Sequence, residues 1–355
     1  KFIYRKTRAS KKFILRDFIV QKIAIIKLSA MGDIIHSMVA LQFIKIKYPN
    51  IQIDWFVEDA FSKVLENNPD INNIIKLNLK SIKNSKKEIL TQLKLVKSFK
   101  NRDYDLIIDA QGLIKSAIVA RFLGKNRVGF CKNSTREGIA SFFYNKKVSI
   151  SYDKNVIDRN CYLFSKALNF EISKDDILNK KPFLFFKNED EKVYQYLDET
   201  RKNILLVVGA SWKSKMYSKE KFVKIVQSLK ENFFIAWGNE EEKEIAEFIC
   251  DNSDAIVLPK IDLNTLKALI SRVDLVIGND TGPTHMAWAL NIPSITIFGN
   301  TPAYRNAYET KINKSVESSS VVNPFKLDKK DFSIKMIDEN IIIKIAKELL
   351  SVQKN

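Results

Sequence analysis

The sequence predicts an α/β protein built from two Rossmann-like, doubly wound domains that face a central cleft. Short apolar runs alternate with segments of helical periodicity, the pattern of a parallel sheet with helical crossovers. The pattern starts twice, at Ile23 and at Ile204, with a charged stretch before the second start. The chain has 355 residues, which is longer than most domains with a single hydrophobic core.

The first half supplies the elements of one domain, expected over residues 23–180. β-rich runs predict strands at 23–26, 51–57, 74–75 and 106–109. Apolar residues at helical spacing predict helices after Gly32-Asp33, over 86–99 and over 114–123. Residues 1–22 form a basic extension with eight Lys/Arg and one Asp, either a disordered tail or an anchor on anionic lipid.

The second half repeats this architecture over residues 203–330, after a linker at 181–202 that we expect to contain a solvated helix. Strands are expected at 204–208, 233–237, 255–258, 275–277 and 294–298, and helices at 219–229, 240–249, 263–270 and 284–290. Residues 331–355 contain a last helix, 339–352, which we expect to pack back on the first domain. Two such domains across a cleft form the arrangement called GT-B in glycosyltransferases.

Composition restricts the kind of partner. A formal charge of +18 points to nucleic acid, a phosphorylated substrate or a membrane surface, without choosing among them. The three cysteines fit no metal or redox spacing, which indicates reduced, cytoplasmic thiols. No window approaches the roughly 18 to 20 apolar residues of a spanning helix.

The most informative segment is Gly278-Asn279-Asp280-Thr281-Gly282-Pro283-Thr284-His285. A buried strand breaks at two glycines, exposes an acid, a hydroxyl and one of the chain's two histidines, and restarts as a helix. Helix N-termini attract anions, and open α/β sheets bind ligands where strands end. We therefore expect a phosphorylated ligand here.

Three further loops follow strands of the second half, at residues 209–215, 238–242 and 259–262. Ser211, Lys213 and Lys215 suit a diphosphate, and a short loop with solvated lysines is the alternative. The glutamates at 240–242 either bond ribose hydroxyls or simply favour the start of a helix.

In the first half, Asp33 is either a helix N-cap or a general base, with His36 on the next turn. The chain has no G-x-G-x-x-G and no P-loop pattern, which argues against a nicotinamide dehydrogenase or a P-loop NTPase. Asp103-Tyr104-Asp105 precedes a strand and is interpreted as a turn. Residues 76–102, with nine Lys/Arg and one Glu, form a solvated helix face or a landing surface for phosphate-bearing lipid; no nucleic-acid motif accompanies them.

Over residues 23–325 the chain resembles the ADP-heptose:lipopolysaccharide heptosyltransferases, glycosyltransferase family 9. The resemblance rests on sequence blocks at residues 27–36, 53–58, 108–117, 134–137, 142–147, 237–238 and 280–285. The blocks Asp109-Ala-Gln-Gly-Leu-x-Lys-Ser-Ala and Thr135-Arg-Glu look like the branch that adds the first heptose to Kdo.

The resemblance implies roles for particular residues. Asp33 would be the catalytic base of an inverting displacement, and Lys215 would neutralise the leaving ADP without a metal or other cofactor. The donor-binding positions would be Ala210, Ser211, Lys215, Glu240, Ile261, Asp280, Thr281, Gly282 and His285. The acceptor-binding positions would be Ser29, Arg136, Lys83, Lys86 and Lys87.

The chain departs from the family pattern in three places. Ala210-Ser211 stands where relatives often carry paired threonines. Leu28 and Ala30 replace hydroxyl residues, which leaves Ser29 as the side-chain donor of the first loop. A one-residue gap leaves Glu241 as an alternative to Glu240 at the ribose.

The implied function is transfer of L-glycero-D-manno-heptose from ADP-heptose to the Kdo of Kdo-lipid A, on the cytoplasmic face of the inner membrane and without nucleic acid. Another family 9 transferase, adding a second heptose or a different sugar, is the alternative. A basic nucleic-acid-binding protein is the alternative from another class.

Overall fold

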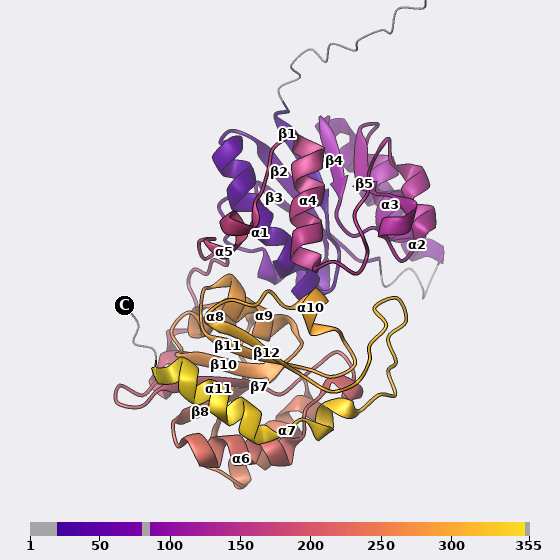
Figure 1. Ribbon diagram of the computed structural model, residues 1–355. Helices are drawn as coiled ribbons and strands as arrows, with labels where there is room; N and C mark the ends of the chain where they lie inside the picture. Colours follow the sequence, from indigo (N-terminus) through magenta and orange to yellow (C-terminus); the bar gives the residue numbers. More distant parts are fainter. Residues whose placement is uncertain (1–19, 80–85, 352–355) are drawn as a thin grey trace, which may run out of the picture.

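A computed structural model describes residues 20–79 and 86–351 and shows two α/β units, one above the other in Figure 1. Each unit has a parallel six-stranded sheet, ordered β3-β2-β1-β4-β5-β6 in the first and β12-β11-β10-β7-β8-β9 in the second. Both follow the strand order of dinucleotide-binding folds, in which the direction of winding reverses beside the first strand. The predicted α/β class with two doubly wound domains is confirmed.

The first unit contains the predicted strands and helices, with ends shifted by a few residues at most. Two short strands, β5 and β6, and the helices α4 and α5 were not predicted. The elements are β1 (Lys22–Ile26), α1 (Met31–Lys47), β2 (Gln52–Glu58), β3 (Asn73–Leu77), α2 (Lys86–Ser98), β4 (Leu106–Asp109), α3 (Ile114–Leu123), β5 (Arg127–Phe130), β6 (Lys146–Val148), α4 (Val156–Leu168) and α5 (Lys174–Leu178).

The second unit also matches, apart from the unpredicted β12 and the short α10. Its central strands are fully buried, as expected for a sheet covered by helices on both faces. The elements are β7 (Asn203–Val207), α6 (Lys219–Leu229), β8 (Asn232–Ala236), α7 (Glu240–Asp251), β9 (Ile256–Val257), α8 (Leu263–Ile270), β10 (Leu275–Asn279), α9 (Gly282–Ala289), β11 (Ser294–Phe298), α10 (Ala303–Asn306) and β12 (Asn313–Glu317).

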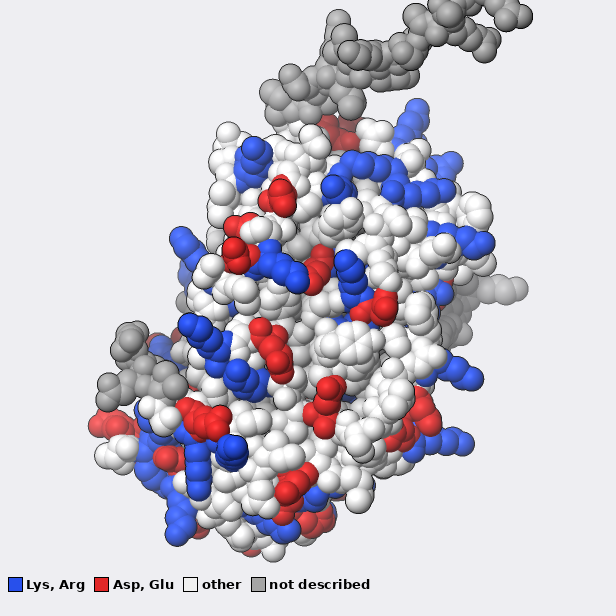
Figure 2. Space-filling view, in the orientation of Figure 1, with Lys and Arg blue, Asp and Glu red and all other residues white. Residues whose placement is uncertain are grey.

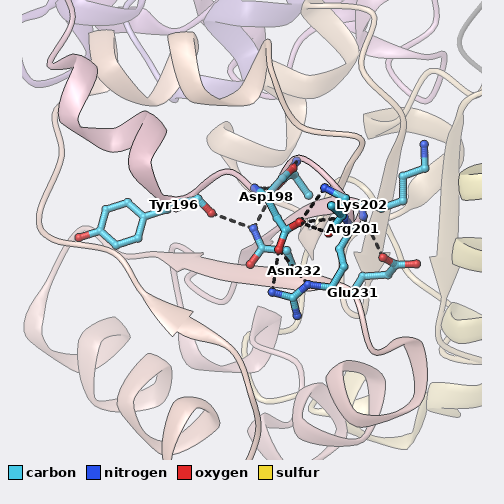
Figure 3. A network of polar contacts seen from close by, with 8 residues as sticks. Tyr196, Asp198, Arg201, Lys202, Glu231 and Asn232 are labelled. Atoms are coloured by element: carbon cyan, nitrogen blue, oxygen red, sulfur yellow. Dashed lines mark hydrogen bonds and ion pairs between the residues drawn. The ribbon is translucent and has the colours of Figure 1, made fainter.

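The segment between the units is a hydrogen-bonded connection, so the expectation of a solvated helix there was wrong. It contains only the short 3-10 helix η6 (Glu191–Tyr196). The Asp198 carboxylate then accepts bonds from the Arg201 backbone and side chain, and Asn232 donates to the Tyr196 carbonyl at 2.8 Å (Figure 3). These local bonds compete with helix formation and tie the connection to the starts of β7 and β8.

The last helix, α11 (Glu339–Ser351), belongs to the second unit, which corrects the expectation that it packs on the first domain. It lies against α6 and beside β10, β11 and β12 (Figure 1). Its buried residues Ile342, Ala346 and Leu349 join a core made only of second-unit side chains. The amphipathic pattern predicted the helix, but it did not identify the sheet that the apolar face covers.

Helices α1 and α9 cross at the boundary between the units. A Cβ on Gly32 would lie 2.9 Å from Cδ2 of His285, and one on Gly282 would collide with the side chain of Met31. The rings of His36 and His285 lie edge to face, with centroids 4.4 Å apart. The two glycines thus permit a close approach of both helix N-termini.

A second contact joins α8 to the 3-10 helix η1 (Asp59–Val64). The fully buried Lys267 donates across the boundary to the Glu66 carbonyl at 3.0 Å, and Asn67 donates to Asn264 at 3.0 Å. Burial lowers the pKa of Lys267 to about 8.

Among the helices of the described residues, none has both the length and the apolar character needed to cross a bilayer.

We predict that Ile342→Ala lowers the free energy of unfolding by about 2–5 kcal/mol, because Ile342 is 0% exposed in the second core. Ile341→Ala is the matched control, since that neighbour is 49% exposed and surface changes cost about 0.5 kcal/mol or less. Urea denaturation followed by circular dichroism measures both. Equal effects would contradict the placement of α11.

Candidate active site

A cleft of about 710 Å³ lies between the units and is lined by residues of both. Its walls are the loops after β1 and β4 in the first sheet and after β7 and β10 in the second. These are the points where each sheet reverses its winding, the usual ligand position in open α/β sheets. The volume is in the range of small-molecule sites.

Asp280 is the centre of the second-unit wall. Its Oδ2 accepts from Lys215 Nζ at 2.6 Å and from Thr301 Oγ1 at 2.7 Å, and its Oδ1 pairs with Nε2 of His285 at 2.9 Å. Burial alone would raise the pKa of Asp280, but the Lys215 ammonium and the His285 contact hold it well below its usual range. Asp280 is therefore ionised and its three partners are fixed in place.

Helix α9 begins directly beside this cluster. Thr281 is its N-cap residue, and Gly282, Thr281 and Pro283 line the cleft. The first N–H groups of a helix lack intrahelical partners and carry partial positive charge. Together with Lys215, this end of α9 makes the wall attractive to an anion.

His36 of α1 lies at the boundary of the units and lines the cleft beside His285. It is buried, its Nδ1 has no hydrogen-bond partner, and its ring meets His285 and Trp288 edge-on. Burial and the neighbouring His285 lower the pKa of His36 well below its ordinary value, and the nearby Asp280 offsets this only in part. His36 is therefore neutral, and it packs against His285 without carrying charge.

The loop after β1 forms the opposite wall. Gln111 Oε1 accepts from the backbone N–H groups of Leu28 and Ser29 at 2.9 and 3.1 Å, and Lys27 donates to the Ala110 carbonyl at 3.0 Å. These bonds join the loops that follow the two neighbouring strands β1 and β4.

Asp33 lies in the first turn of α1, on this wall. It is half-buried, and its Oδ2 accepts a bond from the Ala30 N–H at 3.3 Å. Asp33 is thus in the third helical position and not the N-cap residue. The carboxylate lines the cleft, within reach of a ligand there.

Cations from the first unit and from α10 complete the cleft. Arg159 of α4 is buried and donates to the Ser134 carbonyl at 2.6 Å, Arg136 is exposed, and Arg305 donates to the Tyr152 carbonyl at 3.0 Å. Burial lowers the pKa of Arg159 to about 10, which leaves it charged at neutral pH. The cleft is therefore electropositive.

Most of the predicted site residues meet at this cleft, and several do not. Those that line it are Asp33, Arg136, Ala210, Ser211, Lys215, Asp280, Thr281, Gly282 and His285. Ser29 is half-buried just outside the lining, and Ile261 packs against the core instead. Lys83 lies outside the described residues, as do the side chains of Lys86 and Lys87.

Glu242 lines the cleft, whereas Glu240 is exposed and does not. Glu240 begins α7, while Glu242 folds back so that its carboxylate accepts from the Gly238 N–H at 2.8 Å and from the Asn239 side chain at 2.9 Å. The Glu242 carboxylate fills the space that a side chain on Gly209 would need. Glu241 pairs with Lys213 at 3.0 Å on the surface.

Sequence reasoning gave no role to several residues of the cleft, among them Lys27, Arg159, Asn239, Thr301 and Arg305. Arg159 could have been found from the sequence. The apolar residues of 156–168 recur at helical spacing, and Arg159 lies on the same buried face of that helix, where a cation is unusual. Thr301 lies 21 residues from Asp280, and no sequence pattern links them.

Within the described part of the chain, no three His, Cys, Asp or Glu side chains form a group that could hold a metal ion. Transfer without a metal stays a prediction.

We predict that His36 makes the fold lose stability in acid. The unfolded chain takes up a proton on this residue below about pH 6.5 and the folded protein does not, so the free energy of unfolding falls as pH drops, by about 1.4 kcal/mol at about pH 5.5. His36→Phe keeps an aromatic ring but removes the titration. Thermal unfolding of both proteins between about pH 7.5 and 5.5 measures the slope, and equal slopes would contradict a neutral, buried His36.

Comparison with known proteins identifies the family. The model for glycosyltransferase family 9 (heptosyltransferase) matches residues 92–331. Lipopolysaccharide heptosyltransferase 1 of Campylobacter coli is 43% identical over 92% of this chain and 98% of its own length. The Pseudomonas aeruginosa protein of the same name is 28% identical over 81% of each chain.

Solved structures agree on the fold. The E. coli heptosyltransferase WaaC with ADP-2-deoxy-2-fluoro heptose superimposes with a TM-score of 0.74, at 22% identity, over 92% of this chain and 99% of that one. E. coli ADP-heptose lps heptosyltransferase II gives 0.69 at 20% identity, over 93% and 98%. The two units and their cleft are therefore the GT-B arrangement, and the chain belongs to glycosyltransferase family 9, the heptosyltransferases.

Proposed function

We propose that this protein transfers L-glycero-D-manno-heptose from ADP-heptose to the Kdo of Kdo-lipid A, in the synthesis of the lipopolysaccharide inner core. One observation carries the proposal: the Asp33 carboxylate and the Asp280–Lys215–His285 cluster line one cleft from opposite domains. The Campylobacter coli relative, a lipopolysaccharide heptosyltransferase 1, supports the choice of sugar and acceptor.

The second-domain wall suits the donor. An ammonium has three N–H donors, and Asp280 engages one of those of Lys215, so the others can meet diphosphate oxygens. The start of α9 adds its partial positive charge. Glu242 and Asn239 lie at the far side of the same wall and offer oxygens to ribose hydroxyls.

The first-domain wall suits the acceptor and the base. Asp33 takes the proton of the attacking Kdo hydroxyl, whose oxygen bonds to the anomeric carbon of heptose as the bond from that carbon to the diphosphate breaks. ADP leaves with the bonding electrons, and Lys215 neutralises the charge that develops. Attack opposite the leaving group inverts the anomeric centre, and no metal is needed in this scheme.

The acceptor is carried by a lipid, so we infer a peripheral enzyme on the cytoplasmic face of the inner membrane. Arg136 and Arg159 on the acceptor side offer charge to the acidic sugars and phosphates of such a molecule. Arginines also bind nucleic-acid phosphates. A nucleic-acid-binding protein, however, would not need the second-domain wall with its buried Asp280, so this wall favours the transferase.

Asp33→Asn is expected to lower turnover by about 10²–10⁴-fold, because the general base is lost while the helix turn is kept. ADP affinity should stay at the wild-type value. The assay follows heptose transfer from ADP-heptose to Kdo-lipid A, with already heptosylated lipid as the competing acceptor. Asp59→Asn, an exposed acid outside the cleft, is the control; normal turnover of Asp33→Asn, or preference for the heptosylated lipid, would refute the assignment.

Glu242→Gln is expected to weaken ADP binding by about 10- to 100-fold, the usual worth of a hydrogen bond to a charged group. Glu240→Gln should leave the affinity unchanged, because that side chain is exposed and outside the cleft. Isothermal titration calorimetry with ADP compares the two variants. A larger loss for Glu240→Gln would restore that residue as the ribose ligand.

A further inference from the structure

A short 3-10 helix beside the cleft holds two large apolar side chains in solvent. In η5 (Gly138–Phe143), Ile139 is 61% exposed and Phe142 is 72% exposed. A 3-10 helix repeats every three residues, so these two side chains share one edge. Ala140, between them in sequence, is fully buried.

The structure holds this segment firmly from behind. Ala140 and Tyr144 pack with Ala117 of α3 in a small buried cluster. The Tyr144 hydroxyl donates to Asp109 at 2.7 Å, and Arg127 Nε donates to the Phe143 carbonyl at 2.6 Å. The outward position of Ile139 and Phe142 is therefore set by the fold.

Two cations flank the apolar side chains. Lys132 and Lys147 are exposed; the Lys132 side chain lies beside Gly138 of η5, and the Lys147 ammonium lies 5.7 Å from the centroid of the Phe142 ring. Lys146 precedes Lys147 in strand β6, so it points to the other face of the sheet, where its ammonium donates to the Lys166 carbonyl. Figure 2 shows Lys and Arg side chains gathered over the corner of the first unit where α3 and β5 lie in Figure 1. We call Lys132, Ile139, Phe142 and Lys147 the η5 surface.

Acidic groups do not compensate this charge locally. Between residues 131 and 149 the chain has one acid, Glu137. Its Oε2 accepts the Ile114 N–H at 2.7 Å, at the start of α3, so it serves as a helix cap. The η5 surface is thus cationic with apolar side chains in the middle.

The η5 surface also borders the acceptor side of the cleft. Thr135 and Arg136 line the cleft, and only Glu137 separates them in the chain from Gly138, the first residue of η5. An enzyme whose acceptor is embedded in a bilayer needs this rim of the cleft close to the lipid headgroups.

We propose that the η5 surface docks the enzyme on an anionic phospholipid bilayer, with Ile139 and Phe142 entering the headgroup region and the lysines on lipid phosphates. The proposal rests on the lipid-borne acceptor of the proposed function. Apolar burial and attraction of Lys to an anionic leaflet act together at such a surface, and two separate apolar side chains flanked by cations fit a fluid lipid surface better than a shaped protein partner.

Vesicle co-sedimentation tests the docking. Full-length protein is mixed with vesicles of phosphatidylcholine alone or with phosphatidylglycerol. Wild type should bind the anionic vesicles, with affinity falling as salt rises. Lys132→Gln/Lys147→Gln should bind about 25-fold more weakly, at roughly fivefold per lysine, and Ile139→Ser/Phe142→Ser about tenfold or more weakly.

The control is Ile341→Ser/Lys344→Gln on α11, a pair of exposed apolar and basic residues on the second unit. It should bind like wild type. A second measurement does not depend on removing contacts: Phe142→Trp should gain fluorescence that brominated lipid quenches, while Phe332→Trp on the second unit should not. Wild-type binding by both η5 variants, equal loss in the control, or no quenching at position 142 would overturn the proposal.

Transfer to a deacylated, water-soluble Kdo acceptor separates this proposal from the proposed function. The η5 variants should transfer to the soluble acceptor at the wild-type rate and lose activity only on vesicle-borne Kdo-lipid A. If wild type binds vesicles but transfers to neither acceptor, the proposed function fails and the surface stands. If it transfers to the soluble acceptor but binds no vesicles, the surface fails and the proposed function stands.

Discussion

The crossing of α1 and α9 is the contact on which the site depends. Each helix begins where its sheet reverses winding, so each carries one half of the chemistry at its N-terminal end. The glycines at 32 and 282 let the opposite helix approach until Met31 and His285 fill the space above them. A larger residue at either glycine would separate the helices and, with them, Asp33 from the donor wall. The cleft is thus a product of packing between two domains, and neither domain contains it alone.

Asp280 gives the donor wall its fixed charge pattern. A buried carboxylate is costly unless it is paired, and here Lys215, Thr301 and His285 all engage it. The ion pair between Asp280 and Lys215 orients the Lys215 ammonium before any ligand binds, which reduces the reorganisation that catalysis requires. Neutral His36 supports the His285 ring without adding a charge that would compete for Asp280.

Part of the positive charge of the chain lies on two neighbouring surfaces. Within the cleft, Arg136 and Arg159 lie on the wall that we propose for the acceptor, and Lys215 lies on the wall that we propose for the donor. Outside it, the η5 surface continues from Arg136 onto the exterior. The η5 lysines flank exposed apolar side chains, whereas the cleft cations Arg159 and Arg305 donate to loop carbonyls. This difference separates a surface suited to lipid from one suited to a soluble ligand.

The sequence by itself determined the two αβ repeats and placed Asp33, Lys215 and the 280–285 loop where strands end, because these depend on patterns within one strand-loop-helix unit. The roles expected of Asp33 and Lys215 came from the family resemblance. Local periodicity decides which segments are strands and which helices, and the loops that follow strands meet at one edge of each sheet. Only the tertiary structure decided that Glu242 and not Glu240 faces the cleft, that Thr301 reaches Asp280, and that α11 covers the second sheet. Those outcomes depend on how a helix is rotated about its axis and on which distant segments it meets, and residue order within one segment does not encode either.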